Sequence, residues 1–263
     1  MSTAIFRYPL IHIPAAGAIA TCTQDEIRSF DYYGACHAGS TPGAGFFEFI
    51  PTGQGSLALA VGDVLGEGAP AGVIRSAARS AIRDMAVRHT GHAAGVLQEL
   101  NKLLYWLSPE DYYTSVFYAH LDSARRLLRY VNAAHEPALL VRAEGGCERL
   151  DHSGGVLGLS HRTRFQAHAR FLSPGDVLVT GGGTAGLCDP SQWRLWETAA
   201  AGAVRRNPHA PARDLLCAIV EAFLRSDERS RPIGDWTLAL VRVRGAEAVE
   251  PDAALETAAL AAA

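Results

Sequence analysis

The chain has 263 residues, of which 48% are hydrophobic, and its formal net charge is −3. This length suffices for one large domain or two small ones with a hydrophobic core, and the near-neutral charge offers no basic surface for nucleic acid or anionic membranes. No apolar run approaches the roughly 20 residues of a membrane-spanning helix, and the first residues lack the basic and apolar regions of a signal peptide.

Short β-rich runs separated by glycine, proline, serine and threonine come first. We expect strands within residues 10–13, 18–23, 31–38, 45–51 and 56–64. Two amphipathic helices follow, over 70–89 and 92–107, and the first of them has Pro70 in a first-turn position. Their expected apolar stripes are Ile74, Ala78, Ala81 and Met85, and Val96, Leu100, Leu103, Leu104 and Leu107.

The pattern then returns to strands. We expect them within residues 113–122, 126–135, 137–143, 147–151, 163–171 and 176–181, with a hairpin turn at Glu144–Gly146. Two more helices are expected near 191–205 and 210–226, and a last strand over 235–244. The Ala/Glu-rich tail, residues 246–263, has no partner stripe and is expected to be disordered.

Strands, two helices, and strands again do not make the alternation of a doubly wound parallel sheet, so the order predicts an α+β sandwich of antiparallel sheets faced by helical pairs. It also argues against a dinucleotide-binding turn at Gly181, Gly183 and Gly186, although these residues spell G-x-G-x-x-G. Such a turn belongs at the first βα connection of a βαβ unit, and its last glycine should open a helix. Here Pro190 stands where that helix should be running.

The segment LALAVGDVLGEGAPAGVI, residues 57–74, ends a buried strand at Asp63 and starts a helix near Pro70. Asp63 can be an ordinary Asx-turn residue at a strand-to-helix connection. Alternatively, the surrounding glycines let the backbone approach an ion that the Asp63 carboxylate binds, because hard divalent cations prefer oxygen ligands. The residues alone leave both interpretations open.

This segment, together with TSVFYAHLDSARRLLRYVNAAHEPALLVRAEGGCERLDHSGGVLGL, resembles the metal-dependent PPM-type (PP2C-like) serine/threonine phosphatases of the bacterial SpoIIE/RsbU branch. The resemblance runs from about Ser29 to Val243. SFDYYG (29–34) resembles the opening G-G-D-[FY]-Y-D, the segment ending in TGGG resembles a strand followed by T-D-G, and GDWTLALVRV (234–243) resembles the closing D-D-[IV]-T-L strand.

The resemblance implies one domain over residues 1–245, a β-sandwich of two mainly antiparallel sheets flanked by pairs of helices. It also implies a carboxylate-lined site at one end of the sheets for two ions, Mn²⁺ or Mg²⁺. In such sites the metals lower the pKa of a shared water, and the hydroxide attacks a phosphoserine or phosphothreonine. Asp63 and Asp31 match metal-ligand motifs, and the Val64 backbone is a further candidate ligand.

Two positions depart from the family pattern: Gly181 stands in place of the T-D-G aspartate, and Gly234 in place of the first acid of the closing pair. Two dications about 4 Å apart repel each other strongly, and glycine supplies no charge to offset this. Glu67, Asp189 and Asp235 are candidate substitutes, although adjacent strand residues such as 234 and 235 point to opposite faces. A normal two-metal centre is therefore not expected.

Members of this branch typically dephosphorylate an anti-sigma-factor antagonist, so the resemblance implies such a regulatory protein as partner in a partner-switching pathway. We expect weak or lost catalysis; the alternative is an active Mn²⁺- or Mg²⁺-dependent phosphatase with relocated carboxylates. His135, at a family position near a turn, is interpreted as a structural histidine. Scattered cysteines without C-x-x-C predict free thiols in the cytoplasm. The two long helices could also bury a homodimer interface, and neither nucleic acid nor membrane is expected as a partner.

Overall fold

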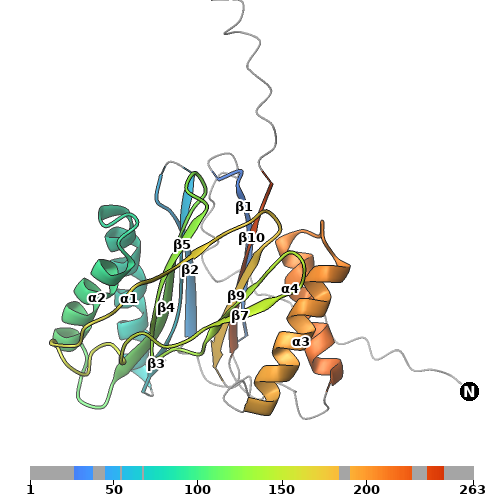
Figure 1. Cartoon of the computed structure of the whole chain (residues 1–263). Coiled ribbons are helices and arrows are strands. Elements are labelled where there is room, and N and C mark those ends of the chain that lie inside the picture. The colour runs from blue at the N-terminus through green and yellow to red at the C-terminus, as the bar shows by residue number, and fades with distance from the viewer. Residues whose placement is uncertain are drawn as a thin grey trace, which may run out of the picture.

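Two antiparallel sheets lie face to face between two pairs of helices in the computed structural model of the chain (Figure 1). The structure describes residues 27–37, 45–53, 55–66, 68–183, 190–226 and 236–245. The predicted α+β sandwich is therefore confirmed. The strands expected within 10–13 and 18–23 and the tail expected after residue 245 lie outside the described residues.

Each sheet has five strands within the described part of the chain. The first sheet has the order β1 (Phe30–His37), β10 (Trp236–Val243), β9 (Val177–Gly183), β6 (Ala138–Val141) and β7 (Cys147–Leu150). The second has the order β2 (Gly45–Pro51), β3 (Ser56–Leu65), β4 (Tyr113–Asp122), β5 (Leu127–Ala133) and β8 (His168–Phe171). Antiparallel pairing throughout removes the βα crossovers that a dinucleotide-binding turn needs, and Gly181 and Gly183 lie inside β9.

The helices cover the two outer faces of the sandwich (Figure 1). Helices α1 (Ala69–Arg88) and α2 (Ala93–Leu107) pack on the β2–β8 sheet, and α3 (Pro190–Arg206) and α4 (Ala212–Ser226) pack on the β1–β7 sheet. Pro70 lies in the first turn of α1, as predicted. In α2, however, Leu103 and Leu107 are partly exposed, because the buried face follows Val96, Leu97, Leu100 and Leu104.

Alternation along β3 decides which residues face the opposite sheet. Leu57, Leu59 and Val61 pack in the core between the sheets, whereas Ala58, Ala60 and Val64 pack beneath α1 and α2. Since successive strand residues point to opposite faces, Asp63 shares the inward face of the first set.

Two predicted strands are shorter than expected, each for a local reason. Residues 126–135 form a strand only to Ala133, because the Asn132 side chain accepts a hydrogen bond of 2.9 Å from the His135 N–H and turns the chain. Residues 163–171 form a strand only over His168–Phe171, and the Thr163 carbonyl instead accepts a bond of 2.8 Å from Gln98 of α2. The hairpin at Glu144–Gly146 is present, with Gly145 at φ +96°.

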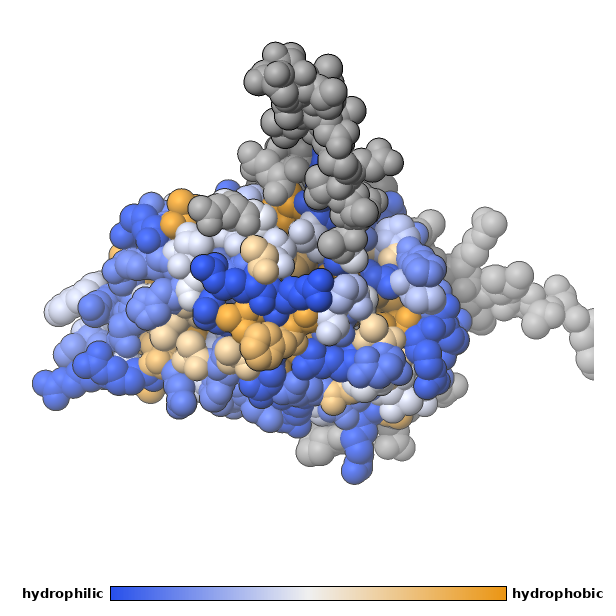
Figure 2. Space-filling model, turned by 45° about the horizontal axis from the view of Figure 1, so that its top comes forward, coloured by the Kyte–Doolittle hydropathy of each residue, from blue (hydrophilic) through white to orange (hydrophobic). Residues whose placement is uncertain are grey.

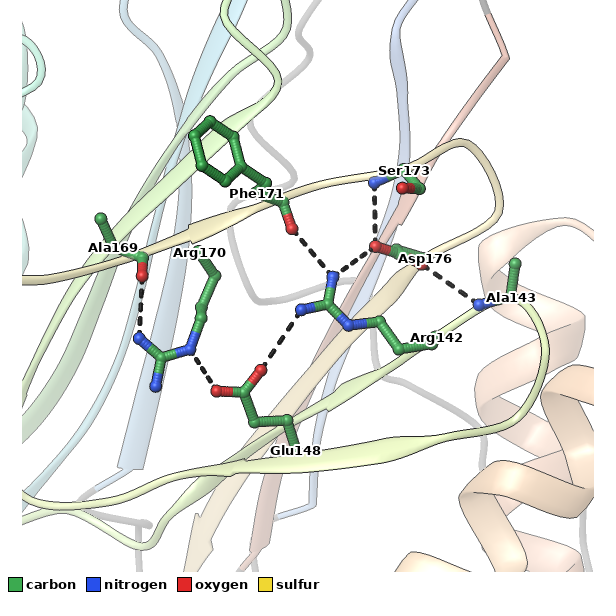
Figure 3. Close-up of polar contacts among 8 residues, drawn as sticks. All are labelled: Arg142, Ala143, Glu148, Ala169, Arg170, Phe171, Ser173 and Asp176. Atoms are coloured by element: carbon green, nitrogen blue, oxygen red, sulfur yellow. Dashed lines mark hydrogen bonds and ion pairs between the residues drawn. The ribbon is translucent and has the colours of Figure 1, made fainter.

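An ionic clasp joins the edge strands of the two sheets (Figure 3). Glu148 of β7 accepts hydrogen bonds from Arg170 of β8 and, at 3.2 Å, from Arg142 at the end of β6. Arg142 also contacts the buried carboxylate of Asp176 at 2.8 Å. The clasp therefore holds the two sheets together along the edge formed by β7 and β8.

The same arginines cover the exposed edge of β8. Arg142 donates to the Phe171 carbonyl and Arg170 to the Ala169 carbonyl, each at 2.8 Å, which occupies groups that another strand could otherwise pair with. The Phe171 ring itself is 77% exposed. With the upper end of the molecule tipped forward, the surface is largely hydrophilic around an apolar patch (Figure 2).

Candidate functional site

Asp63 lies near the end of β3, half-buried, with Gly45 of β2 and Ser115 of β4 as its neighbours in register. Beyond it the chain turns through Gly66, at φ +144°, where a side chain would collide with the Tyr112 ring. Gly68, at φ +78°, precedes α1. These two glycines allow the tight passage from strand to helix, so the Asp63 carboxylate is held at one end of the sandwich.

Polar side chains gather around Asp63 between the sheets, and we call this group the strand-end cluster: Asp63, Ser115, His135, Glu136, Thr180 and Thr237. Ser115 of β4 is paired in register with Asp63 of β3, and its hydroxyl shares a 3.0 Å hydrogen bond with His135 Nδ1. Thr237 of β10 pairs with Gly182 of β9, and a side chain at Gly45 would meet its hydroxyl at 2.5 Å. The cluster therefore collects residues from both sheets at the same end.

His135 is fully buried, and burial lowers the pKa of its imidazole to about 3, with the neighbouring His152 acting in the same direction. The ring is therefore neutral near pH 7, and its 3.4 Å approach to the Glu136 carboxylate is not an ion pair. Its Nε2 and the Thr180 hydroxyl are buried without a hydrogen-bond partner among the described residues. Unsatisfied polar atoms of this kind indicate room for water or a polar ligand.

Gly181 carries no side chain into this cluster. It shares its face of β9 with Val177 and Val179, which pack toward α3 and α4. A Cβ at this position would collide with the Leu238 side chain and lie 2.6 Å from the Thr237 carbonyl. Neighbouring atoms thus fill the space beside Gly181, and an aspartate at this position would not fit without a shift of the backbone.

The residue of β9 that faces inward here is Gly182. A Cβ on it would meet the His135 ring at 2.5 Å and Glu136 Oε2 at 3.2 Å. Glu136 therefore brings a carboxylate to the inner surface of β9. Sequence reasoning missed it, because nothing in the order of residues shows that the turn after β5 folds against β9.

Asp31 does not lie beside Asp63 in the structure, and its role as a metal ligand stays a prediction. The β1–β10 register pairs Asp31 with Arg242, at the end of the sheet opposite Thr237. Cys36, which contacts Thr237, lies five positions after Asp31 in β1, and five positions correspond to about 16 Å of strand. The Asp31 carboxylate instead accepts a 2.8 Å hydrogen bond from the Ala212 N–H at the start of α4.

The remaining candidate ligands can be placed only in part. Val64 follows Asp63 directly and buries its side chain under α1, and its backbone stays a predicted ligand. Glu67, Asp189, Gly234 and Asp235 lie outside the described residues, so their predicted roles remain predictions.

The described residues do not fit a two-metal site. Within the described ranges no three His, Cys, Asp or Glu side chains come close enough together to hold a metal ion. The donors at the strand end are the carboxylates of Asp63 and Glu136, and two carboxylates cannot balance the charge of two dications.

Among the cysteines that the structure describes, Cys36 contacts the strand-end cluster, with its Sγ 3.5 Å from the Thr237 hydroxyl. Burial raises the pKa of the Cys36 thiol, so it stays protonated near neutral pH. A protonated thiol is a poor nucleophile, which argues against cysteine-based catalysis at the strand end. In the part of the chain that the structure describes, no helix is both long and apolar enough to cross a bilayer.

Comparison with known proteins gives one matching family, described as Stage II sporulation protein E (SpoIIE), over residues 53–244. Two curated relatives of Bacillus subtilis (strain 168) are named phosphoserine phosphatases. RsbU is 26% identical over 136 residues, which is 51% of this chain and 40% of RsbU. RsbP is 24% identical over 227 residues, which is 84% of this chain and 53% of RsbP. The chain thus spans about half the length of these relatives.

A solved structure, the PP2C phosphatase domain of SpoIIE from Bacillus subtilis with a fragment of its regulatory domain, superposes with a TM-score of 0.65. It is 13% identical and covers 82% of this chain and 64% of that one. At this identity the likeness establishes the fold alone, and it confirms the predicted PP2C-like sandwich.

Proposed function

Because the chain belongs to the SpoIIE family, we propose that it acts in a bacterial partner-switching pathway and binds a phosphorylated anti-sigma-factor antagonist, with weak or no hydrolysis of the phosphate. The two relatives named as phosphoserine phosphatases support a serine-phosphorylated protein as the partner. The proposal includes a cytoplasmic location, where partner-switching proteins meet, and leaves room for a homodimer.

The observation that carries this proposal is the shortage of negative charge at the strand end. Among the described residues, Asp63 is the motif carboxylate at the strand end. Position 181 is on the other face of β9, toward α3 and α4, and Asp31 lies at the opposite end of its sheet. Two dications about 4 Å apart would bring four positive charges, and their mutual repulsion needs several carboxylates to offset it. Without a stable metal pair, hydrolysis loses its nucleophile and its electrostatic stabilisation.

The shortage of negative charge at the strand end also affects how a phosphorylated partner can be recognised. A phosphoserine and the Asp63 carboxylate repel each other unless a cation lies between them. Affinity for a phosphorylated partner must then come from contacts away from the phosphate. The protein would hold its partner as a binding module rather than turn it over.

The alternative, an active Mn²⁺- or Mg²⁺-dependent phosphatase with relocated ligands, is favoured by one contact. Glu136 Oε2 lies 3.2 Å from the position of a Cβ on Gly182, on the inward face of β9. Together with Asp63, and with Glu67, Asp189 or Asp235, it would restore part of the missing charge.

The two functions are separated by measuring phosphate release from a serine-phosphorylated anti-sigma-factor antagonist in the presence of Mn²⁺. We compare the natural protein with Asp63→Asn, Glu136→Gln and the matched control Glu144→Gln, an exposed carboxylate on the β6–β7 turn. We expect all four proteins to release phosphate at the same low rate. Each should still bind the phosphorylated antagonist in a calorimetric titration, because the missing charge affects turnover and not partner binding.

Robust Mn²⁺-dependent turnover that falls by about a hundredfold in Asp63→Asn and Glu136→Gln, but not in Glu144→Gln, would replace this proposal with the active alternative. Loss of phosphate release without loss of antagonist binding in those variants would identify the two carboxylates as ligands rather than as structural residues.

A further inference from the structure

A surface pocket of about 420 Å³ lies where α2 ends. The end of α2 and the end of β3, the strand that carries Asp63, lie at the same end of the sandwich (Figure 1). We call the pocket the α2-end pocket, and its lining residues are Tyr105, Ser108, Pro109, Glu110, Asp111, Tyr113, Gly158 and Leu159. Tyr113 pairs in register with Leu65, two residues beyond Asp63. The pocket therefore begins about 7 Å along the strands from the candidate site.

The electrostatic character of the pocket is negative. Glu110 and Asp111 contribute two exposed carboxylates, and the described residues that line the pocket include no lysine, arginine or histidine. Helix α2 ends at the pocket and has no basic residue in its last turn, so the partial negative charge of its terminal carbonyls is not offset there. These features favour a cation and disfavour phosphate, nucleic acid or an anionic membrane.

The exposed wall of the pocket is more polar than apolar, and it includes two tyrosines. Tyr105 and Tyr113 line it, and the ring of Trp106, 82% exposed, packs edge-on against Tyr105 with ring centroids 5.2 Å apart. Leu107 and Leu159 are 41% and 57% exposed beside it. Aromatic faces attract cations, and such a group of exposed apolar side chains marks a surface that another protein covers.

Ser108 adds a polar atom to this wall. Its hydroxyl oxygen is buried and has no hydrogen-bond partner among the described residues. The Tyr105 ring also contacts the ring of His161, with ring centroids 5.1 Å apart.

We propose that the α2-end pocket receives an arginine or lysine side chain of the protein partner, whose neighbouring apolar residues cover Trp106, Leu107 and Leu159. The cation meets the two carboxylates and the tyrosine faces. This inference rests on the proposed function, because it supplies the contact away from the phosphate that binding requires there. It makes partner recognition depend on a basic residue near the phosphorylated serine.

The test uses two peptides, Ac-Ala-Leu-Arg-Leu-Ala-NH₂ and the same peptide with citrulline, which has the shape of arginine without its charge. Binding is followed by two-dimensional NMR of the full chain without metal or phosphate. We expect the arginine peptide to shift the amides of residues 105–113 and 158–159, and to bind about tenfold more tightly than the citrulline peptide. Glu110→Gln with Asp111→Asn should remove this difference, and Glu144→Gln should retain it. Asparagine suits position 111 because Asp111 has φ +68°.

Equal binding of the two peptides, or shifts confined to other residues, would overturn the proposal. So would concentration-dependent shifts of the same amides without peptide, since these would show that a second copy of the chain covers the pocket. The experiment contains no phosphorylated protein and measures no turnover. A failure here would therefore leave the proposed function standing, and a failure of the proposed function would leave this result interpretable.

Discussion

The imidazole of His135 is held neutral in the strand-end cluster, and this makes the stability of the fold depend on pH. Because burial depresses its pKa in the folded protein to about 3, the unfolded chain takes up the proton first as the pH falls. The associated stability is complete above the ordinary histidine pKa, about 6.5, and is lost progressively as the pH falls from there toward 3.

We predict that the natural protein loses about 2 kcal/mol more unfolding free energy between pH 8 and pH 5 than the variant His135→Gln. The measurement is urea unfolding of both proteins at each pH. Glutamine keeps a polar side chain beside Ser115 but has no proton to gain. Parallel loss of stability in the two proteins would show that His135 is not the group responsible.

Asp31 shows at the scale of whole elements what the sequence could not reveal. Its carboxylate accepts a hydrogen bond from Ala212, 181 positions away in the chain, and so caps α4 from a strand. Its charge also faces Arg242, a buried guanidinium whose pKa burial lowers. A carboxylate in this position stabilises the helix start through the terminal N–H groups and the helix dipole.

We predict that Asp31→Ala lowers the unfolding free energy by about 1 kcal/mol and leaves Mn²⁺ binding unchanged. Asp31→Asn, which keeps an oxygen acceptor for the Ala212 N–H, should lose less. Thermal or urea unfolding gives the first quantity, and a calorimetric titration gives the second. A change in metal affinity with unchanged stability would restore Asp31 to the metal site.

The elements themselves were largely predictable, because the continuous apolar runs of β3 and β4 and the 3.6-residue stripes of α1 and α4 are local patterns. Strand pairing across the sandwich is not local. It decides that Asp31 and Asp63 lie at opposite ends, that Glu136 reaches Gly182, and that Gly181 faces α3 and α4. The resemblance to a family located Asp63 but could not show which carboxylates the fold brings beside it.

At the scale of the whole molecule, the contacts that join the two sheets and the proposed partner-binding surface lie in different places. The clasp of Arg142, Glu148 and Arg170 ties the edge strands of the two sheets on one side (Figure 3). The strand-end cluster and the α2-end pocket lie together where β3 ends. A partner that enters at this end therefore meets an acidic pocket with two tyrosines beside a site where the described residues supply the carboxylates of Asp63 and Glu136.

A calorimetric titration of the natural protein with Mn²⁺ tests that shortage of charge most directly, with Asp63→Asn as the control. We predict no pair of tight sites, so the heats of the two proteins should differ by one weak site at most, with Kd on the order of millimolar. Two Mn²⁺ ions bound per chain with Kd on the order of micromolar, and lost in Asp63→Asn, would contradict the account.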